Sequence, residues 1–178
     1  MRRRILEMIT HRAVVMMAGL PGTGKSTLAT RLARSLGLLV IDKDLIHSVM
    51  MDRGADRAQS AEIAYEISFW LLADFVNRQD KSAIFDSAGR QPFVLGRLQN
   101  ICAQARTPLK VIHCRATAAE RARRLNARTS VSSQLQTNQF ADADDLVFYA
   151  YLPDNRLIVD TTDGVDFVLH DCLVYLQQ

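Results

Sequence analysis

One segment constrains the fold of this 178-residue chain more than any other: residues 19–26 read Gly-Leu-Pro-Gly-Thr-Gly-Lys-Ser. They follow a short apolar run at residues 13–18, which is typical of a buried parallel strand. They precede residues 27–36, whose apolar side chains recur at helical spacing before Gly37. The pattern G-x-x-x-x-G-K-[ST] between a strand and a helix points backbone N–H groups at a phosphate. The sequence therefore predicts a nucleoside triphosphate site.

Each residue type in this loop has a chemical reason to be there. The three glycines let the backbone turn tightly and approach a ligand where a Cβ atom would block it. Lys25 can reach the β- and γ-phosphates, and the hydroxyl of Ser26 can ligate Mg²⁺. The residues expected to bind the nucleotide are Gly19, Leu20, Pro21, Gly22, Thr23, Gly24, Lys25, Ser26 and Thr27.

The composition is that of a soluble globular protein. Hydrophobic residues make up 48% and charged residues 23% of the chain, and the formal net charge is only +3. Such a balance creates no strong field for nucleic acid or a membrane surface. The chain has no window near the ~18 apolar residues of a membrane span, and no secretory signal follows the Arg2–Arg4 run. The three cysteines are odd in number and widely spaced, so buried free thiols and a cytoplasmic location are expected.

Strand-like and helix-like segments alternate along the chain, which is the signature of a parallel α/β sheet. After the first strand, further strands are predicted at 38–41, 83–85, 109–114 and 157–159. Helices are predicted at 27–36, 45–51, 58–78, 92–105, from Thr117, and over 165–176. The predicted fold is therefore α/β, a three-layer P-loop NTPase fold with a five-stranded parallel sheet between helices.

Residues 1–178 are expected to form a single domain with two appendages. Residues 1–11 are an N-terminal extension, and the polar, weakly patterned stretch that ends near residue 141 predicts a short lid over about 124–141. Trp70 and the pair Met16 and Met17 are interpreted as core residues rather than ligand contacts.

Carboxylates follow two of the predicted strands at the edge where ligands of such sheets bind. Asp42 and Asp44 come directly after the second strand and would point the same way, near the phosphates. Asp44 could accept the proton of an attacking hydroxyl, or it could cap the helix that follows. Asp86 ends the third strand and could hold the water shell of Mg²⁺, or it could cap the next turn.

An arginine-rich helix precedes the polar stretch. Arg124 and Arg128 are four residues apart and share one helix face, where they could stabilise the charge on a transferring phosphoryl group. For Arg121 and Arg123 a solvated surface is the alternative. Closing such residues over the site with a lid would exclude water and so protect the nucleotide from hydrolysis.

These motifs together resemble the small P-loop kinases of the polynucleotide kinase, zeta toxin and chloramphenicol phosphotransferase kind, over about residues 13–176. The resemblance rests on the glycine loop, Asp44 and Asp86 in their contexts, Arg124-x-x-x-Arg128, and Asp160-Thr161-Thr162. It implies that Asp44 is the general base toward a substrate hydroxyl. It also implies that Arg124 belongs to the lid over the adenine side and that Arg128 contacts the transferring phosphate.

One position departs from that family. Members that act on nucleic acid or sugar-nucleotide ends often carry an arginine three residues after the base, where it grips a substrate phosphate. This chain has His47 there. A histidine binds phosphate only when protonated or as a neutral donor, and a plain helix residue is the alternative.

The predicted function is an ATP- and Mg²⁺-dependent phosphotransferase that moves the γ-phosphoryl group to a hydroxyl of a small molecule. Its expected catalytic residues are Lys25, Asp44, Arg124 and Arg128, and its expected metal contacts are Ser26 and, through water, Asp86. A 5′-hydroxyl nucleic acid kinase is an alternative that is not favoured, because residues 45–59 offer only Arg53 and Arg57 as a basic channel. An ATPase or nucleotide-dependent switch module is the alternative of another class. The acceptor pocket is expected between the helices at 45–78 and the turn after Asp86.

Overall fold

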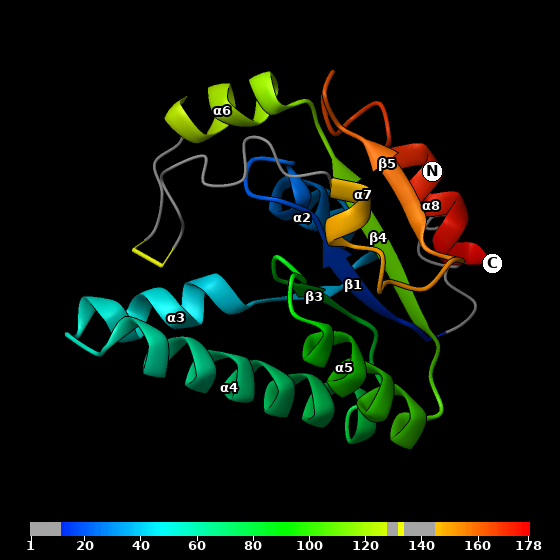
Figure 1. Cartoon of the computed structure of the whole chain (residues 1–178). Helices are drawn as coiled ribbons and strands as arrows, with labels where there is room; N and C mark the ends of the chain where they lie inside the picture. Colours follow the sequence, from blue (N-terminus) through cyan, green and yellow to red (C-terminus); the bar gives the residue numbers. More distant parts are fainter. Residues whose placement is uncertain (1–11, 128–131, 134–144) are drawn as a thin grey trace.

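The computed structural model of the chain describes residues 12–127, 132–133 and 145–178 (Figure 1). Five strands form one parallel sheet with the order β2-β3-β1-β4-β5. The strands are β1 (Val14–Ala18), β2 (Leu39–Asp42), β3 (Ala83–Asp86), β4 (Leu109–Arg115) and β5 (Leu157–Asp160). This confirms the predicted five-stranded parallel sheet. The strand that leads into the glycine loop, β1, lies at its centre.

Helices cover both faces of the sheet (Figure 1). They are α2 (Lys25–Leu36), α3 (Lys43–Asp52), α4 (Arg57–Asn77), α5 (Pro92–Ala105), α6 (Ala118–Ala127), α7 (Asp145–Phe148) and α8 (Leu169–Gln177). Helix α2 begins two residues before the predicted start, directly after the glycine loop, and the short α7 was not predicted. Among the described residues, no helix combines the length and the apolar character that crossing a membrane would require.

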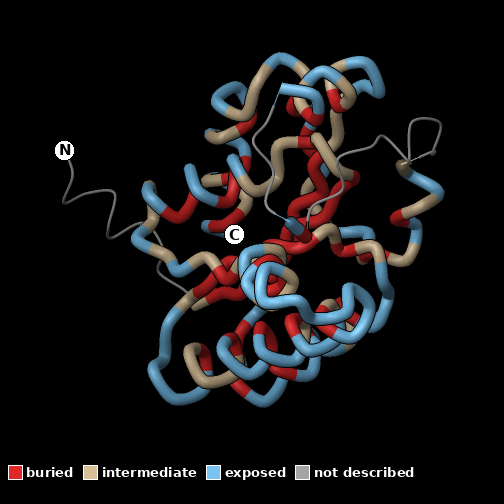
Figure 2. Tube along the Cα trace, turned by 90° about the vertical axis from the view of Figure 1, so that its left-hand side faces the viewer, coloured by how far each residue is buried: buried red, intermediate tan, exposed pale blue. Residues whose placement is uncertain are grey.

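Alternate side chains of β1 enter two separate hydrophobic cores, one on each face of the sheet. Met16 is buried with residues of α4 and α5, whereas Met17 is buried with residues of α2 and α8. The prediction that both methionines are core residues is confirmed. Figure 2 shows the buried residues along the middle of the molecule and the exposed residues on the outer sides of the helices. The two cores give the molecule its three layers.

The three cysteines are buried and free, as predicted. Cys102 belongs to the core under α4 and α5, and Cys114 and Cys172 belong to the core under α2 and α8. Burial raises the pKa of the Cys102 and Cys172 thiols to about 12. A thiol with such a pKa is a poor nucleophile at neutral pH, so these residues act as small apolar side chains.

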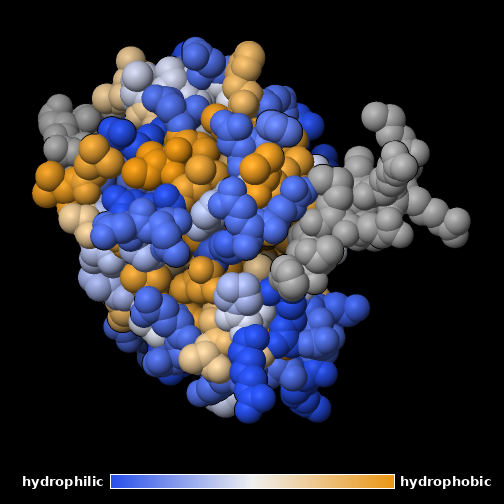
Figure 3. Space-filling view, turned by 90° about the vertical axis from the view of Figure 1, so that its right-hand side faces the viewer, coloured by the Kyte–Doolittle hydropathy of each residue, from blue (hydrophilic) through white to orange (hydrophobic). Residues whose placement is uncertain are grey.

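Apolar side chains also reach the surface on the side of the molecule that carries β5 and α8. Figure 3 shows this face, with hydrophobic atoms gathered over its upper half. The exposed large apolar residues of α7, β5 and the C-terminal segment are Leu146, Val147, Ile158, Phe167 and Val174. The edge of the sheet at β5 therefore presents exposed apolar side chains on this face.

The prediction that Trp70 belongs to the core was wrong. Its side chain is 74% exposed, whereas its neighbour Phe69 is 1% exposed and stacks on Phe85 with ring centroids 5.2 Å apart. Helix α4 is apolar on more than one face. One apolar stripe with helical spacing is largely exposed, and it contains Ile63, Ile67, Trp70 and Leu71. Helical spacing alone therefore did not identify which apolar stripe faces the sheet.

Adjacent alanine substitutions test this orientation of α4. Phe69→Ala is expected to lower the free energy of unfolding by about 3–5 kcal/mol, because it leaves a cavity between α4 and the sheet. Trp70→Ala is expected to cost less than about 1 kcal/mol, since most of that ring already contacts water. Guanidinium unfolding followed by circular dichroism measures both. Similar losses for the two variants would contradict the observed orientation of α4.

Candidate active site

The glycine loop fits so closely under its neighbours that side chains would collide at two positions. Gly19 and Gly22 have φ values of 145° and 84°, in the region that favours glycine. A Cβ atom on Gly19 would lie 2.4 Å from the carbonyl oxygen of Cys114 in β4. One on Gly22 would lie 2.7 Å from the carbonyl oxygen of Arg121 in α6. The loop is thus packed between the sheet and α6.

Segments far away in the sequence hold the loop in place. The N–H of Gly19 donates to the carbonyl oxygen of Ala88, 3.2 Å away, in the turn after β3. The Thr161 hydroxyl, in the segment after β5, donates to the carbonyl oxygen of Thr23 at 2.7 Å. Within the loop the Thr23 hydroxyl donates to the carbonyl oxygen of Leu20 at 2.8 Å. The backbone N–H groups are therefore oriented before any ligand binds.

Two pockets meet at Lys25 and Ser26, the first residues of α2. The first pocket has a volume of about 530 Å³ and is lined by α3, the start of α4, residues 88–91 and Ser133. The second, of about 320 Å³, lies between the glycine loop and α6, where Arg123 and Arg124 line it. Both volumes lie in or near the range of small-molecule sites. The positive end of α2 thus faces two neighbouring spaces at once.

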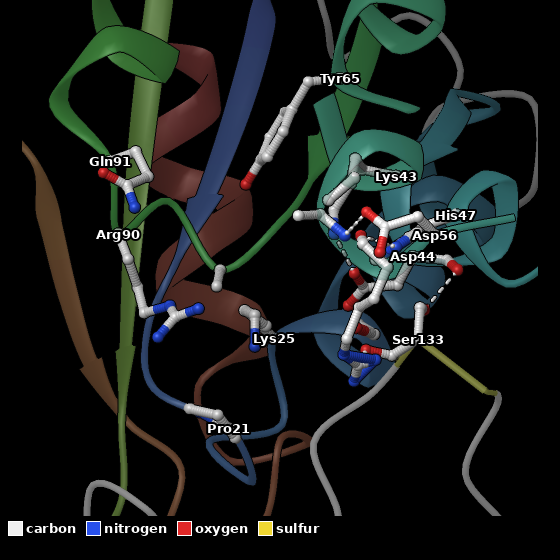
Figure 4. A pocket seen from close by; sticks show the side chains of 15 residues that line it. Pro21, Lys25, Lys43, Asp44, His47, Asp56, Tyr65, Arg90, Gln91 and Ser133 are labelled. Atoms are coloured by element: carbon white, nitrogen blue, oxygen red, sulfur yellow. Dashed lines mark hydrogen bonds and ion pairs between the residues drawn. The ribbon is translucent and has the colours of Figure 1, made fainter. Parts of the chain in front are cut away.

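Asp44 lies on the wall of the first pocket opposite Arg90 in the view of Figure 4. It does not cap α3, because Asp42 does: the Asp42 carboxylate accepts from the N–H groups of Asp44 at 2.8 Å and Leu45 at 3.4 Å. The ammonium group of Lys43 lies 2.5 Å from the Asp44 carboxylate. Because Asp42 caps the helix, the Asp44 carboxylate is left at the surface of the pocket.

Asp86 is buried at the end of β3, where the sheet register pairs it with Asp42. Burial raises the pKa of Asp86 to about 6, while the nearby charge of Lys25 and a hydrogen bond with Ser26 oppose this rise. Its Oδ1 atom has no hydrogen-bond partner among the described residues. It does not cap the following turn, because the N–H of Gly89 donates to the Ser87 hydroxyl instead. A buried carboxylate oxygen without a partner beside Lys25 and Ser26 suits a hydrated cation.

The arginine helix contributes one residue that links the glycine loop to the C-terminal segment. Arg124 donates to the carbonyl oxygens of Gly22, Thr161 and Thr162, and its Nε donates to Glu120 at 2.7 Å. Arg124 thus lies beside the phosphate side of the second pocket. The expected partner Arg128 lies outside the described residues.

The other two arginines of this helix differ from each other. Arg123 is solvent-facing and pairs with Glu120 at 2.6 Å, which agrees with a solvated surface. Arg121 is buried, with its backbone against Gly22. The surface alternative is therefore wrong for Arg121, because α6 lies on the loop and not in solvent on that side.

Only parts of the predicted lid at about 124–141 are described: residues 124–127 and 132–133. Ser133 contacts α3 next to the pocket, since its hydroxyl donates to the carbonyl oxygen of Asp44 at 2.7 Å. Its N–H donates to the Ser48 hydroxyl at 3.1 Å. These two contacts bring the segment after α6 to the wall of the first pocket that carries Asp44.

His47 has a structural role in the described part of the chain. It is buried, and its Nε2 lies 3.1 Å from the carbonyl oxygen of Arg57, so Nε2–H donates there. Burial lowers the pKa of His47, and the charge of Lys43 lowers it further. A neutral ring with its N–H engaged is a poor phosphate ligand, which favours the plain helix residue. His47 instead ties α3 to the backbone of Arg57.

Sequence reasoning missed several residues of the first pocket. A pocket lies where the acceptor was expected, between the helices at 45–78 and the turn after Asp86, but several of its lining side chains were not named. They include Lys43, Tyr65, Arg90 and Gln91. The position of Arg90 and Gln91 just after the third strand was a usable signal. Nothing in the sequence signalled that Tyr65 lines a pocket, because an aromatic residue on an apolar helix is usually packed in the core.

Solved structures share this fold across nearly the whole chain. A candidate kinase from Chloroflexus aurantiacus J-10-fl is 23% identical with a TM-score of 0.72, and the match covers 93% of this chain and 99% of that one. A gluconokinase from Sinorhizobium meliloti 1021 is 16% identical with a TM-score of 0.62, covering 93% and 92%. The APS kinase of Mycobacterium tuberculosis, solved with AMPPNP and APS, is 16% identical with a TM-score of 0.63, covering 94% and 99%. At these identities the likeness shows the fold.

The fold is therefore that of P-loop NTPases, as predicted. No curated protein sequence matches the chain. A family model, AAA_33, described as an AAA domain, matches residues 14–147, which include the glycine loop, Asp44 and Asp86. That match spans well over half of the chain and runs from the first strand to α7. The chain belongs to this AAA domain family.

Proposed function

We propose that this protein is a kinase that transfers the γ-phosphoryl group of ATP, with Mg²⁺, to a hydroxyl of a small molecule. The observation that carries the proposal is the junction of two pockets at Lys25 and Ser26. A nucleotide in the second pocket would place its terminal phosphate at the floor of the first. An acceptor in the first pocket, of about 530 Å³, would then meet that phosphate beside Asp44.

In the proposed reaction Asp44 accepts the proton of the acceptor hydroxyl. The hydroxyl oxygen forms a bond to the γ-phosphorus atom, the bond from that phosphorus to the bridging β–γ oxygen breaks, and ADP leaves. Lys25 and the backbone N–H groups of the loop stabilise the charge on the phosphate oxygens. Asp44 ends the step protonated and returns the proton to water.

Ser26 and Asp86 are the residues that would hold Mg²⁺. The Ser26 hydroxyl and the partnerless Oδ1 of Asp86 fit a hydrated ion that shares its coordination with the triphosphate. In the described part of the chain no cluster of three histidine, cysteine or acidic residues could bind a metal alone. This agrees with an ion that arrives with the nucleotide. When bound, it would neutralise charge on the phosphates.

The lid arginines complete the proposal. Arg124 holds the glycine loop against the segment after β5 and lines the nucleotide pocket. Arg128, by the resemblance of its Arg-x-x-x-Arg spacing, is proposed to contact the transferring phosphate. The names of the structural neighbours, a gluconokinase and an APS kinase, support a small-molecule acceptor. The finer likeness to the polynucleotide kinase, zeta toxin and chloramphenicol phosphotransferase group rests on the motifs alone.

Incubation with Mg²⁺ and γ-labelled ATP tests the proposal. The acceptor panel contains sugars, sugar acids, nucleosides, hydroxylated antibiotics and 5′-hydroxyl oligonucleotides. Label on a small molecule is expected. If only the oligonucleotides become labelled, the nucleic acid kinase would replace the proposal. If phosphate is released only to water, at the same rate with every acceptor, the ATPase or switch module would be favoured.

Substitution of the proposed base separates chemistry from nucleotide binding. Asp44→Asn is expected to lower the transfer rate by about 100-fold to 10,000-fold, because the hydroxyl loses its proton acceptor. The Kd for ATP is expected to stay within about twofold, because the side chain lies on the acceptor side of the junction. Labelled transfer and equilibrium dialysis measure the two quantities. Asp74→Asn, on the exposed face of α4, is the control, and undiminished transfer by Asp44→Asn would defeat the base assignment.

Asp86 is expected to lower stability at neutral pH. Because its pKa is raised from 3.8 to about 6, the folded protein binds this proton more tightly than the unfolded chain does. Above pH 6 the ionised carboxylate therefore lowers the free energy of unfolding by about 2–3 kcal/mol. This loss of stability becomes smaller as the pH falls toward 4. Without nucleotide, Asp86→Asn should be more stable than the wild type at pH 8 and equal to it near pH 4. Urea unfolding at both values measures this, and a less stable variant at pH 8 would contradict it.

A further inference from the structure

Lys43 is a buried lysine that contacts the proposed base. Its ammonium group lies 2.5 Å from Oδ1 of Asp44, and the two side chains are 11% and 29% exposed. A lysine is rarely buried unless it is paired, because its charge otherwise loses its hydration without compensation. Among the described residues, no hydrogen bond reaches the other carboxylate oxygen of Asp44, Oδ2. The ion pair therefore engages one oxygen and leaves the other open to a ligand.

Aromatic rings hold Lys43 in this position. Its ammonium group lies over the face of Tyr65, 5.1 Å from the ring centroid, where a cation is attracted to the ring. Tyr65 stacks on Phe69 with centroids 5.9 Å apart and is nearly perpendicular to Phe93 at 5.3 Å. Phe69 in turn stacks on Phe85 of β3. A line of packed side chains therefore connects Lys43 to the central sheet.

The surroundings of Lys43 differ from those of Lys25, the lysine of the phosphate loop. Lys25 lines both pockets at their junction, where the phosphates of the proposed nucleotide would lie. Lys43 lines the first pocket but not the second, and lies between a carboxylate and an aromatic ring. Phosphoryl transfer depends mainly on positioning, and a misplacement of about 1 Å can cost about 100-fold in rate. A lysine that fixes the carboxylate can therefore serve the reaction without touching phosphate.

We infer that Lys43 is a positioning residue of the proposed reaction: its ammonium group holds Oδ1 of Asp44, so that Oδ2 accepts the proton of the acceptor hydroxyl. The inference rests on the proposed function, and the bond changes at phosphorus are those given above. It assigns a separate task to each residue of the run 42–44, because Asp42 caps α3. Tyr65 supports the lysine from the side of the sheet.

Nuclear magnetic resonance tests the contact without nucleotide, acceptor or turnover. The chain has only four lysines, so carbon-13-labelled lysine gives few signals, and the signal of Lys43 is the one lost in Lys43→Met. Because the ring of Tyr65 lies beside the ammonium group, the neighbouring CεH2 protons are expected upfield of those of the exposed Lys81. Asp44→Asn and Tyr65→Leu are each expected to move them toward the Lys81 position.

Lys110 is the matched control within the same spectrum. Its ammonium group lies over the ring of Tyr175 at 5.0 Å, with no carboxylate of the described residues within ion-pair distance. Its signal is therefore expected to be shifted by that ring and to stay in place in both variants. A Lys43 signal that is equally insensitive to Asp44→Asn would overturn the inference, since the carboxylate would then not hold the lysine.

Kinetics with an acceptor found by the labelled assay test the role in transfer. Lys43→Met is expected to lower kcat about 10-fold to 100-fold, while the KM for the acceptor and the Kd for ATP change by less than about threefold. Lys43→Arg should restore part of kcat, because a guanidinium group can also pair with Oδ1. Lys110→Met is expected to keep kcat within about twofold of the wild type.

The same substitution in the Asp44→Asn background distinguishes positioning from direct catalysis. A residue that acts through the carboxylate has nothing left to position there, so Lys43→Met is expected to change the residual rate by less than about twofold. An equal fold loss in both backgrounds would overturn the inference, because Lys43 would then act on the reacting groups independently of Asp44.

Failure of the kinase proposal would look different. If no acceptor is labelled although the Lys43 signal responds to Asp44→Asn, the contact exists but both the kinase proposal and the role of Lys43 in it are wrong. If transfer occurs and Lys43→Met leaves kcat unchanged, the kinase proposal stands and the inference about Lys43 is overturned.

Discussion

The whole arrangement depends on the close fit of the glycine loop between β1 and its neighbours. At Gly19 a single added carbon would meet a carbonyl oxygen of β4, and at Gly22 it would meet the backbone of α6. Because β1 is the central strand, the strands on both sides end around this loop. The turn after β3 and the segment after β5 each hydrogen-bond to it. The two pockets that share Lys25 and Ser26 therefore lie beside one closely packed loop.

Charge is unevenly distributed around that loop. Asp42 and Asp86 are neighbours in the sheet register, and burial raises the pKa of both carboxyls. Lys25 lies close enough to lower both values. Buried charges that are only partly paired lower the stability of a protein without ligand. Such charges are common at sites that bind charged ligands.

Much of the fold was predictable because its signals are local. The strands are short apolar runs, α5 begins at a proline, and α2 ends at a glycine in the left-handed region, so their positions follow from nearby residues. Trp70 shows the limit. An apolar helix offers more than one stripe at helical spacing, and only contact with Phe85 and the sheet shows that Phe69, and not Trp70, faces inward. Helix α7 was missed because its four residues are too few to show a period.

The sequence by itself determined the phosphate loop, the parallel sheet and the carboxylates at the strand ends, because each depends on residues that are adjacent or regularly spaced. It also predicted where the first pocket lies, since strand ends and the helices that follow them share one edge of the sheet. Only the tertiary structure decided which aspartate caps α3 and which stays open, that Arg121 is buried, and that Arg57 and Arg90 line one pocket. These facts depend on contacts between segments distant in the chain. No local pattern encodes such contacts until the sheet has brought the segments together.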